Sequence, residues 1–125
     1  MSLRDYLDSF HRAVGRIDDY GFSESIDINE EIRASKQAVT KVRIVLVDRS
    51  VLQVKEYIDA KYKIDKISYA YQYHDEEGKL IFRYDNARHK PDLGFIEHKH
   101  LSDGSIVECS VPDISDVVDE VIEHI

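Results

Sequence analysis

The stretch KIDKISYAYQYHDEEGKLIFRYD, residues 63–85, decides the fold of this chain. Over residues 63–74 apolar and polar side chains alternate, which is the pattern of a strand with one buried face. The tetrapeptide DEEG then ends in Gly78, a residue that adopts positive φ without strain and is typical of a hairpin turn. Residues 79–85 return as a second strand. The stretch therefore predicts an antiparallel hairpin.

This hairpin carries a stripe of three tyrosines. Tyr69, Tyr71 and Tyr73 fall on one face of the first strand, together with Ile67. Alternating aromatic side chains on a central strand are most often core residues, and we expect the stripe to be buried. The alternative is that the rings stack nucleic-acid bases, as aromatic side chains do in proteins that bind single strands.

Further strands are predicted on both sides of the hairpin. Residues 39–47 and 51–60 are rich in β-branched side chains and are joined by the short turn DRS. Residues 24–36 alternate only weakly, because two adjacent glutamates interrupt the apolar pattern. Beyond the hairpin, residues 96–101 and 105–111 flank the turn SDG. Short turns between successive strands indicate an antiparallel meander.

Helices are predicted at both ends of the chain. Apolar residues recur at spacings of three and four over residues 3–17, with Ser2 as N-cap and Asp5 three positions on. Residues 113–124 show a second apolar stripe at helical spacing. The order of elements predicts an α+β fold, in which an antiparallel meander sheet of five or six strands has the N- and C-terminal helices packed on one face. We expect residues 1–125 to form a single domain.

The composition narrows the class of protein. Of the 125 residues, 42% are apolar and 34% are charged, which is typical of a globular chain. No apolar run approaches the roughly 18 residues of a membrane span, and the N-terminus is too charged for a secretory signal. Cys109 is the one cysteine, so an internal disulfide is excluded and a reducing cytoplasm is predicted.

Charge is distributed unevenly along the chain. The net charge of −8 argues against unspecific binding of nucleic acid. Residues 32–100, however, carry 14 basic and 10 acidic side chains, whereas residues 101–125 have no lysine or arginine. The middle of the chain is therefore locally basic, which leaves a site for a phosphate-bearing ligand open beside the simpler interpretation of acidic outer helix faces.

Histidines gather after the hairpin. His98 and His100 share one face if their segment is a strand, and His89 precedes them in a loop with Pro and Gly. Such imidazoles can bind a metal, or they can act as general acid and base, as in metal-independent RNA cleavage. An HxH pair on a solvated strand edge is the commoner situation, and Asp85 with Asn86 also fits an Asx turn at a strand end.

One carboxylate is out of place in the apolar pattern. Glu56 shares the parity of Leu52, Val54 and Ile58, where an unpaired charge would be costly. Arg83 interrupts the neighbouring pattern in a similar way, so we expect either a Glu56–Arg83 interaction across the sheet or a position near a solvated edge.

Three segments resemble the TumE-like proteins, a family of small toxins of toxin–antitoxin systems. They are VKEY at 54–57, YAYQYHDEEGKLIFRYDNA at 69–87 and HKHL at 98–101. The resemblance implies a cytosolic toxin with a helix-turn-helix antitoxin encoded beside it. In that family, Tyr-Asp-Asn is usually followed by Ala, Pro and two His. Here Arg88 stands in place of Pro and Lys90 in place of the second His, which weakens a metal site.

We therefore predict the toxin of such a pair, a ribonuclease that uses histidine acid/base chemistry with no metal or other cofactor. The alternative is a module that binds a partner protein or an anionic ligand without turnover, and a metal-dependent activity is a third hypothesis. A homodimer is left open. The predicted catalytic residues are His89, His98, His100, Asp85 and Glu56, and the predicted substrate contacts are Arg83, Tyr84, Asn86, Lys99 and Tyr57.

Overall fold

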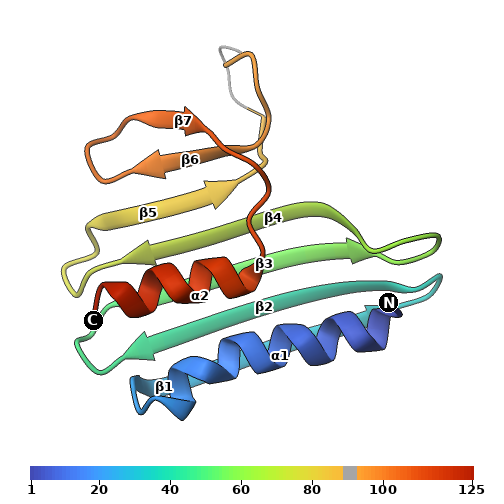
Figure 1. Ribbon diagram of the computed structural model, residues 1–125, viewed down its shortest axis with the longest axis horizontal. Helices are drawn as coiled ribbons and strands as arrows, with labels where there is room; N and C mark the ends of the chain where they lie inside the picture. Colours follow the sequence, from blue (N-terminus) through green and yellow to red (C-terminus); the bar gives the residue numbers. More distant parts are fainter. Residues whose placement is uncertain (89–92) are drawn as a thin grey trace.

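The computed structural model describes residues 1–88 and 93–125. In these residues seven antiparallel strands form one sheet in the order β1-β2-β3-β4-β5-β6-β7, with a helix at each end of the chain (Figure 1). The elements are α1 Leu3–Asp19, β1 Ser23–Arg33, β2 Gln37–Leu46, β3 Val51–Asp59, β4 Asp65–His74, β5 Leu80–Asp85, β6 His98–Leu101, β7 Ile106–Glu108 and α2 Ile114–Glu123. The α+β meander is confirmed, whereas the expected five or six strands are corrected to seven.

The strand hardest to predict, β1, is an edge strand. Its register places Ile28 opposite Val42 and Ile32 opposite Ala38, on the face that carries the helices. Ile28 and Ile32 nevertheless stay 46% and 65% exposed, because they lie at the margin of the core. A strand that buries little apolar surface shows a weak alternation in its sequence, which accounts for the uncertain strand count.

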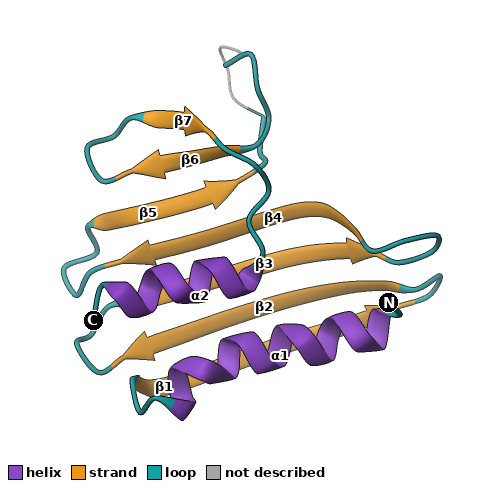
Figure 2. Ribbon diagram, in the orientation of Figure 1, coloured by secondary structure: helices purple, strands orange, loops and turns teal. Residues whose placement is uncertain are grey.

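Both helices cover the same face of the sheet, as predicted. They lie over β1 to β4 in Figure 2, and Arg16 of α1 joins Asp119 of α2 at 2.6 Å. The predicted cap of α1 is confirmed, since Ser2 and Asp5 exchange side-chain and backbone hydrogen bonds of 3.0 Å. Within the described residues neither helix is long and apolar enough to span a membrane.

The core fills the space between the helices and the sheet. Tyr69, Tyr71 and Tyr73 are buried there beside Phe82, in one cluster with apolar residues of α1 and α2. The prediction that the tyrosine stripe is core is confirmed, and the base-stacking alternative is wrong because no ligand can reach the buried rings.

The opposite face of the sheet, here called the open face, is covered by neither helix. Because side chains alternate along each strand, every central strand directs polar side chains to this face, and the register aligns them across the sheet. Its central residues are Lys41, Arg43, Gln53, Lys55, Ala70, Gln72, Arg83, Asp85, His98 and His100.

Candidate functional site

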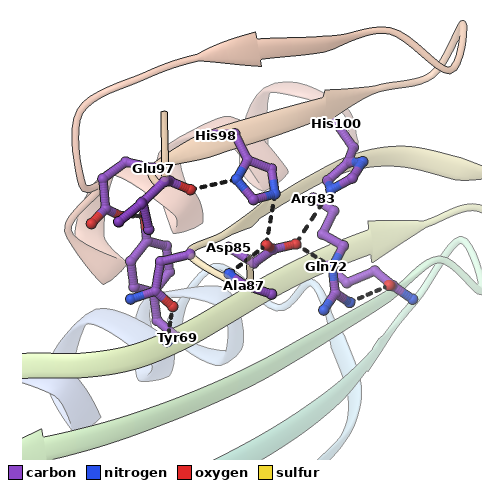
Figure 3. Close-up of polar contacts among 10 residues, drawn as sticks. Tyr69, Gln72, Arg83, Asp85, Ala87, Glu97, His98 and His100 are labelled. Carbon is purple, nitrogen blue, oxygen red and sulfur yellow. Dashed lines mark hydrogen bonds and ion pairs between the residues drawn. The ribbon is translucent and has the colours of Figure 1, made fainter. Parts of the chain in front are cut away.

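Four side chains of β5 and β6 meet on the open face (Figure 3). The carboxylate of Asp85 lies at their centre, since Oδ1 is 2.8 Å from His98 Nε2 and Oδ2 is 2.7 Å from Arg83 Nε. His100 Nε2 lies 3.4 Å from the same Oδ2. The pairing of β5 with β6 dictates this arrangement, because it sets Asp85 opposite His98 and Arg83 opposite His100. We call these four residues the Asp85 cluster.

His98 is the most deeply buried member of the cluster, with 0% of its side chain exposed. Its Nδ1 lies 2.5 Å from the carbonyl oxygen of Ile96 and its Nε2 faces Asp85. Both partners accept hydrogen bonds, so both ring nitrogens are donors when His98 is an imidazolium and Asp85 a carboxylate. The pair is then a buried, hydrogen-bonded ion pair that fixes the end of β6 against β5.

Asp85 is held in its ionised form. Burial alone would raise its pKa, but hydrogen bonds from the Arg83 side chain and the Ala87 backbone, together with the charge of His98, hold the pKa below its usual range. The 3.0 Å bond from Ala87 N–H to Oδ1 is the predicted Asx turn at the end of the strand. Asp85 therefore orients its neighbours as a fixed negative charge.

His100 and Arg83 are the solvent-accessible members of the cluster. Their side chains are 21% and 35% exposed. Arg83 also donates from Nη1 to Gln72 Oε1 at 2.8 Å, so that Asp85 and Gln72 together fix the plane of its guanidinium (Figure 3). An accessible imidazole beside an oriented guanidinium can transfer a proton near a bound phosphate group.

The same residues contain a candidate ligand set for a metal ion. Ligand atoms of Asp85, His98 and His100 all lie within 4.8 Å of one another. The carbonyl of Ile96 would fix the tautomer of His98, as backbone carbonyls do for histidine ligands. Arg83, however, places a positive charge on the carboxylate that a cation would use.

Glu56 lies elsewhere. It is fully buried on the helix-covered face, where it accepts hydrogen bonds from Tyr6 Oη at 2.5 Å and from Tyr71 Oη, and Lys66 Nζ lies 3.4 Å away. Arg83 occupies the opposite face. The expected Glu56–Arg83 interaction is therefore wrong, because the sheet separates the two side chains. For the same reason Glu56 cannot share a substrate with the histidines.

Two predicted substrate contacts are also on the helix side. Tyr84 Oη donates to Glu120 at 2.6 Å, and Lys99 Nζ lies 2.8 Å from the same carboxylate, so both tie the sheet to α2. Strand parity places them there, since their neighbours Asp85 and His98 point the other way. Tyr84 and Lys99 therefore lie on the face of the sheet opposite to the histidines with which they were predicted to bind a substrate.

The other predicted site residues, Asn86, Tyr57 and His89, lie in different places. The Asn86 side chain accepts from Tyr69 N–H and donates to the Ile67 carbonyl, each at 3.1 Å, so it closes the end of β4. Tyr57 does lie on the open face, where its hydroxyl donates to Gln37 at 2.9 Å. His89 falls outside the described residues, as does Lys90.

Sequence reasoning missed the partner that orients Arg83. Gln72 was absent from the predicted site although a signal existed. It alternates with the buried tyrosines, and the hairpin around Gly78 pairs Gln72 with Arg83 on the face that the tyrosines leave. The signal is this alternation alone, because an irregularity between Tyr73 and His74 shifts the pairing by one residue, and counting outward from the turn would pair Gln72 with Phe82.

The fold and the Asp85 cluster define a small α+β protein with a polar, histidine-containing site on an open sheet face. The family model described as Toxin TumE matches residues 13–125, so this chain belongs to the TumE toxin family. Membership of a toxin family implies an antitoxin as partner. Comparison with curated proteins and with solved structures finds no significant match.

Proposed function

We propose that this chain is the toxin of a toxin–antitoxin pair and cleaves RNA without a metal ion, with His100 as an acid/base group. One observation supports this most strongly. His100 and Arg83, a proton carrier and an anion-binding group, are both partly exposed and are held by a single carboxylate that is itself buried. The match to a toxin family is consistent with the proposal but specifies no reaction.

In the proposed reaction His100 accepts the proton of a ribose 2′-hydroxyl while the 2′-oxygen bonds to the adjacent phosphorus. The bond from phosphorus to the 5′-oxygen breaks, and that oxygen leaves with a proton from a second acid. The products are a 2′,3′-cyclic phosphate and a 5′-hydroxyl. Arg83 stabilises the charge on the phosphate oxygens. His89 stays the sequence-based candidate for the second acid.

His98 has a different role in this proposal. Because its side chain is fully buried, it cannot exchange a proton directly with a bound substrate. It holds Asp85 instead, and Asp85 orients His100 and Arg83. The structure thus favours one accessible imidazole supported by a buried pair, rather than two equivalent imidazoles.

Cleavage of RNA by the purified chain tests the proposal. We expect His100→Ala to lower the cleavage rate about 10²- to 10⁴-fold, the usual contribution of a general acid or base. His11→Ala is the matched control, because His11 is an exposed histidine of α1 whose partner is Glu30 on β1. Cleavage by His100→Ala at the wild-type rate would contradict the assignment. Absence of any RNA cleavage by the wild type would favour a module that binds without turnover.

A metal-dependent activity is the second candidate, favoured by the three convergent ligand atoms of the Asp85 cluster. Cleavage assays with a chelator, and then with added Zn²⁺ or Mn²⁺, separate the two. The metal-free proposal expects the same rate throughout. Loss with the chelator and recovery with one metal would replace it.

The partner and location remain proposals of the same kind. We propose that the antitoxin is a helix-turn-helix protein and that the toxin acts in the cytoplasm. Toxicity on expression in a bacterial host without the partner, relieved by the neighbouring reading frame, is the expected result. Light scattering measures the molar mass in solution and shows whether the toxin is a homodimer.

A further inference from the structure

The central open face is arranged as two parallel rows of side chains that cross the strands. The register aligns Arg43, Gln53, Gln72, Arg83 and His100 in one row, from β2 to β6. The second row lies two residues away on every strand, toward the same edge of the sheet, and holds Lys41, Lys55, Ala70, Asp85 and His98. We call the two rows together the basic strip.

From this arrangement we propose that the basic strip binds the backbone of single-stranded RNA and leads it to His100. The inference rests on the proposed function, since it names the substrate and its path to the same site. Four strand intervals of about 4.8 Å give the strip a length of about 19 Å. The strip therefore covers several nucleotides upstream or downstream of the bond at His100.

The charge of the strip suits a polyanion. Arg43, Lys41 and Lys55 are exposed, and across the described residues 1–88 and 93–125 no ion pair within 4.0 Å joins any of these three to a carboxylate. Arg83 continues the positive charge to the cluster. This surface stands out in a chain of net charge −8, which would otherwise repel nucleic acid.

The shape of the strip favours a single strand. Its two rows lie about 7 Å apart, the length of two residues of a strand, which matches one phosphate backbone better than a duplex. The strip borders a hollow of about 580 Å³, whose lining includes Arg43, Gln53, Lys55, Ala70, Gln72 and Arg83 of the strip and, at its β1 end, Asp27 and Asn29. A single strand also permits the in-line geometry that 2′-oxygen attack requires.

The residue types favour RNA over an acidic protein segment. Between β2 and β6 the two rows contain only one apolar side chain, that of Ala70. Protein interfaces need larger apolar anchors at their centre. Lysine, arginine and glutamine side chains are typical contacts of phosphate and sugar, and they carry no sequence readout by themselves. We therefore expect binding with little sequence preference.

The strip is tested with a fluorescein-labelled single-stranded RNA whose anisotropy is measured in the cleavage-deficient His100→Ala background. The test variant adds Lys41→Gln, Arg43→Gln and Lys55→Gln. Each lost phosphate contact removes about 0.7 from the slope of log K against log salt, so the slope should fall by about 2 and the affinity about 100-fold near 0.1 M salt. The matched control adds Arg4→Gln, Arg12→Gln and Lys79→Gln, which change the net charge equally at exposed positions outside the strip.

The outcomes separate this inference from the proposed function. Equal RNA binding by the test and control variants, while the wild type cleaves RNA through His100, would overturn the strip alone. Strip-dependent RNA binding without any cleavage would support the strip and overturn the ribonuclease. Binding of an acidic peptide such as polyglutamate through the strip, with no binding of RNA, would overturn the RNA assignment.

Discussion

The sheet carries one buried carboxylate on each face, and the two have opposite surroundings. Glu56 lies under the helices, bound by Tyr6, Tyr71 and Lys66. Asp85 lies on the open face, bound by side chains of which two reach solvent. Both satisfy the rule that a buried charge needs partners. The two carboxylates are chemically alike, but only Asp85 has partners, Arg83 and His100, that are accessible from solvent.

Around Glu56 the hydrogen-bond donors are locked. Burial, with the nearby charge of Glu56, raises the pKa of both Tyr6 and Tyr71, so their hydroxyls stay protonated and donate. Lys66 also donates to Tyr71 Oη at 2.6 Å and to the Pro112 carbonyl at 2.9 Å, which ties β4 to the segment before α2. The Glu56 network thus joins the sheet to both helical ends of the chain and is structural.

The largest loss of stability is expected on removal of the Glu56 carboxylate. We expect Glu56→Ala to lower the free energy of unfolding by about 3–5 kcal/mol, because it removes the acceptor of the Tyr6 and Tyr71 hydroxyls and the carboxylate that balances the charge of the largely buried Lys66. Urea denaturation measures this. Tyr6→Phe is the milder control, with an expected loss of about 1 kcal/mol. A loss below about 1 kcal/mol for Glu56→Ala would mean that water reaches the network.

Removal of the charge of Asp85 should have a smaller effect on stability. Asp85→Asn keeps the shape but weakens the bonds to Arg83 and His98, so we expect a loss of about 2 kcal/mol near neutral pH. Because the folded pKa of Asp85 is below its unfolded value of about 3.9, this contribution is present above that value and is lost as pH falls through the folded pKa. The difference between wild type and Asp85→Asn should therefore shrink below about pH 4. A difference that grows with acid would contradict the ion pair.

A variant at the exposed side of the Asp85 cluster tests whether His100 contributes to stability. His100 is partly exposed and its contact with Asp85 is long, at 3.4 Å. We expect His100→Ala to change the free energy of unfolding by about 1 kcal/mol or less, although it should abolish most RNA cleavage. Thermal or urea unfolding of the purified variant decides this. A loss as large as that of Asp85→Asn would make His100 a structural residue.

The smallest effect on stability is expected at an ion pair outside both the Glu56 network and the Asp85 cluster. Arg49 and Glu24 meet at 3.4 Å, with their side chains 66% and 44% exposed. Solvent screens such a pair, so Glu24→Gln should change stability by less than about 0.5 kcal/mol. This variant is the baseline for the urea series, and a larger loss would show that charge on the sheet edge matters in its own right.

Sequence alone determined the local structure of this chain. Alternation of side chains, helical spacing and turn residues gave the helices, the central hairpin, the antiparallel order and the burial of the tyrosines, because these depend on neighbours in sequence. The same parity placed His98 and His100 together. The edge strand β1 was the least certain of the predicted strands, because it buries little apolar surface and its alternation is weak.

The polar residues that lie close together are set by tertiary structure. The register of β5 on β6 brought Asp85 to both histidines, and the helices on one face put Glu56, Tyr84 and Lys99 out of their reach. The rows of the basic strip likewise join residues from five strands. The physical reason is that alternation shows which residues share a face of one strand, whereas register and helix placement set which faces and neighbours come together.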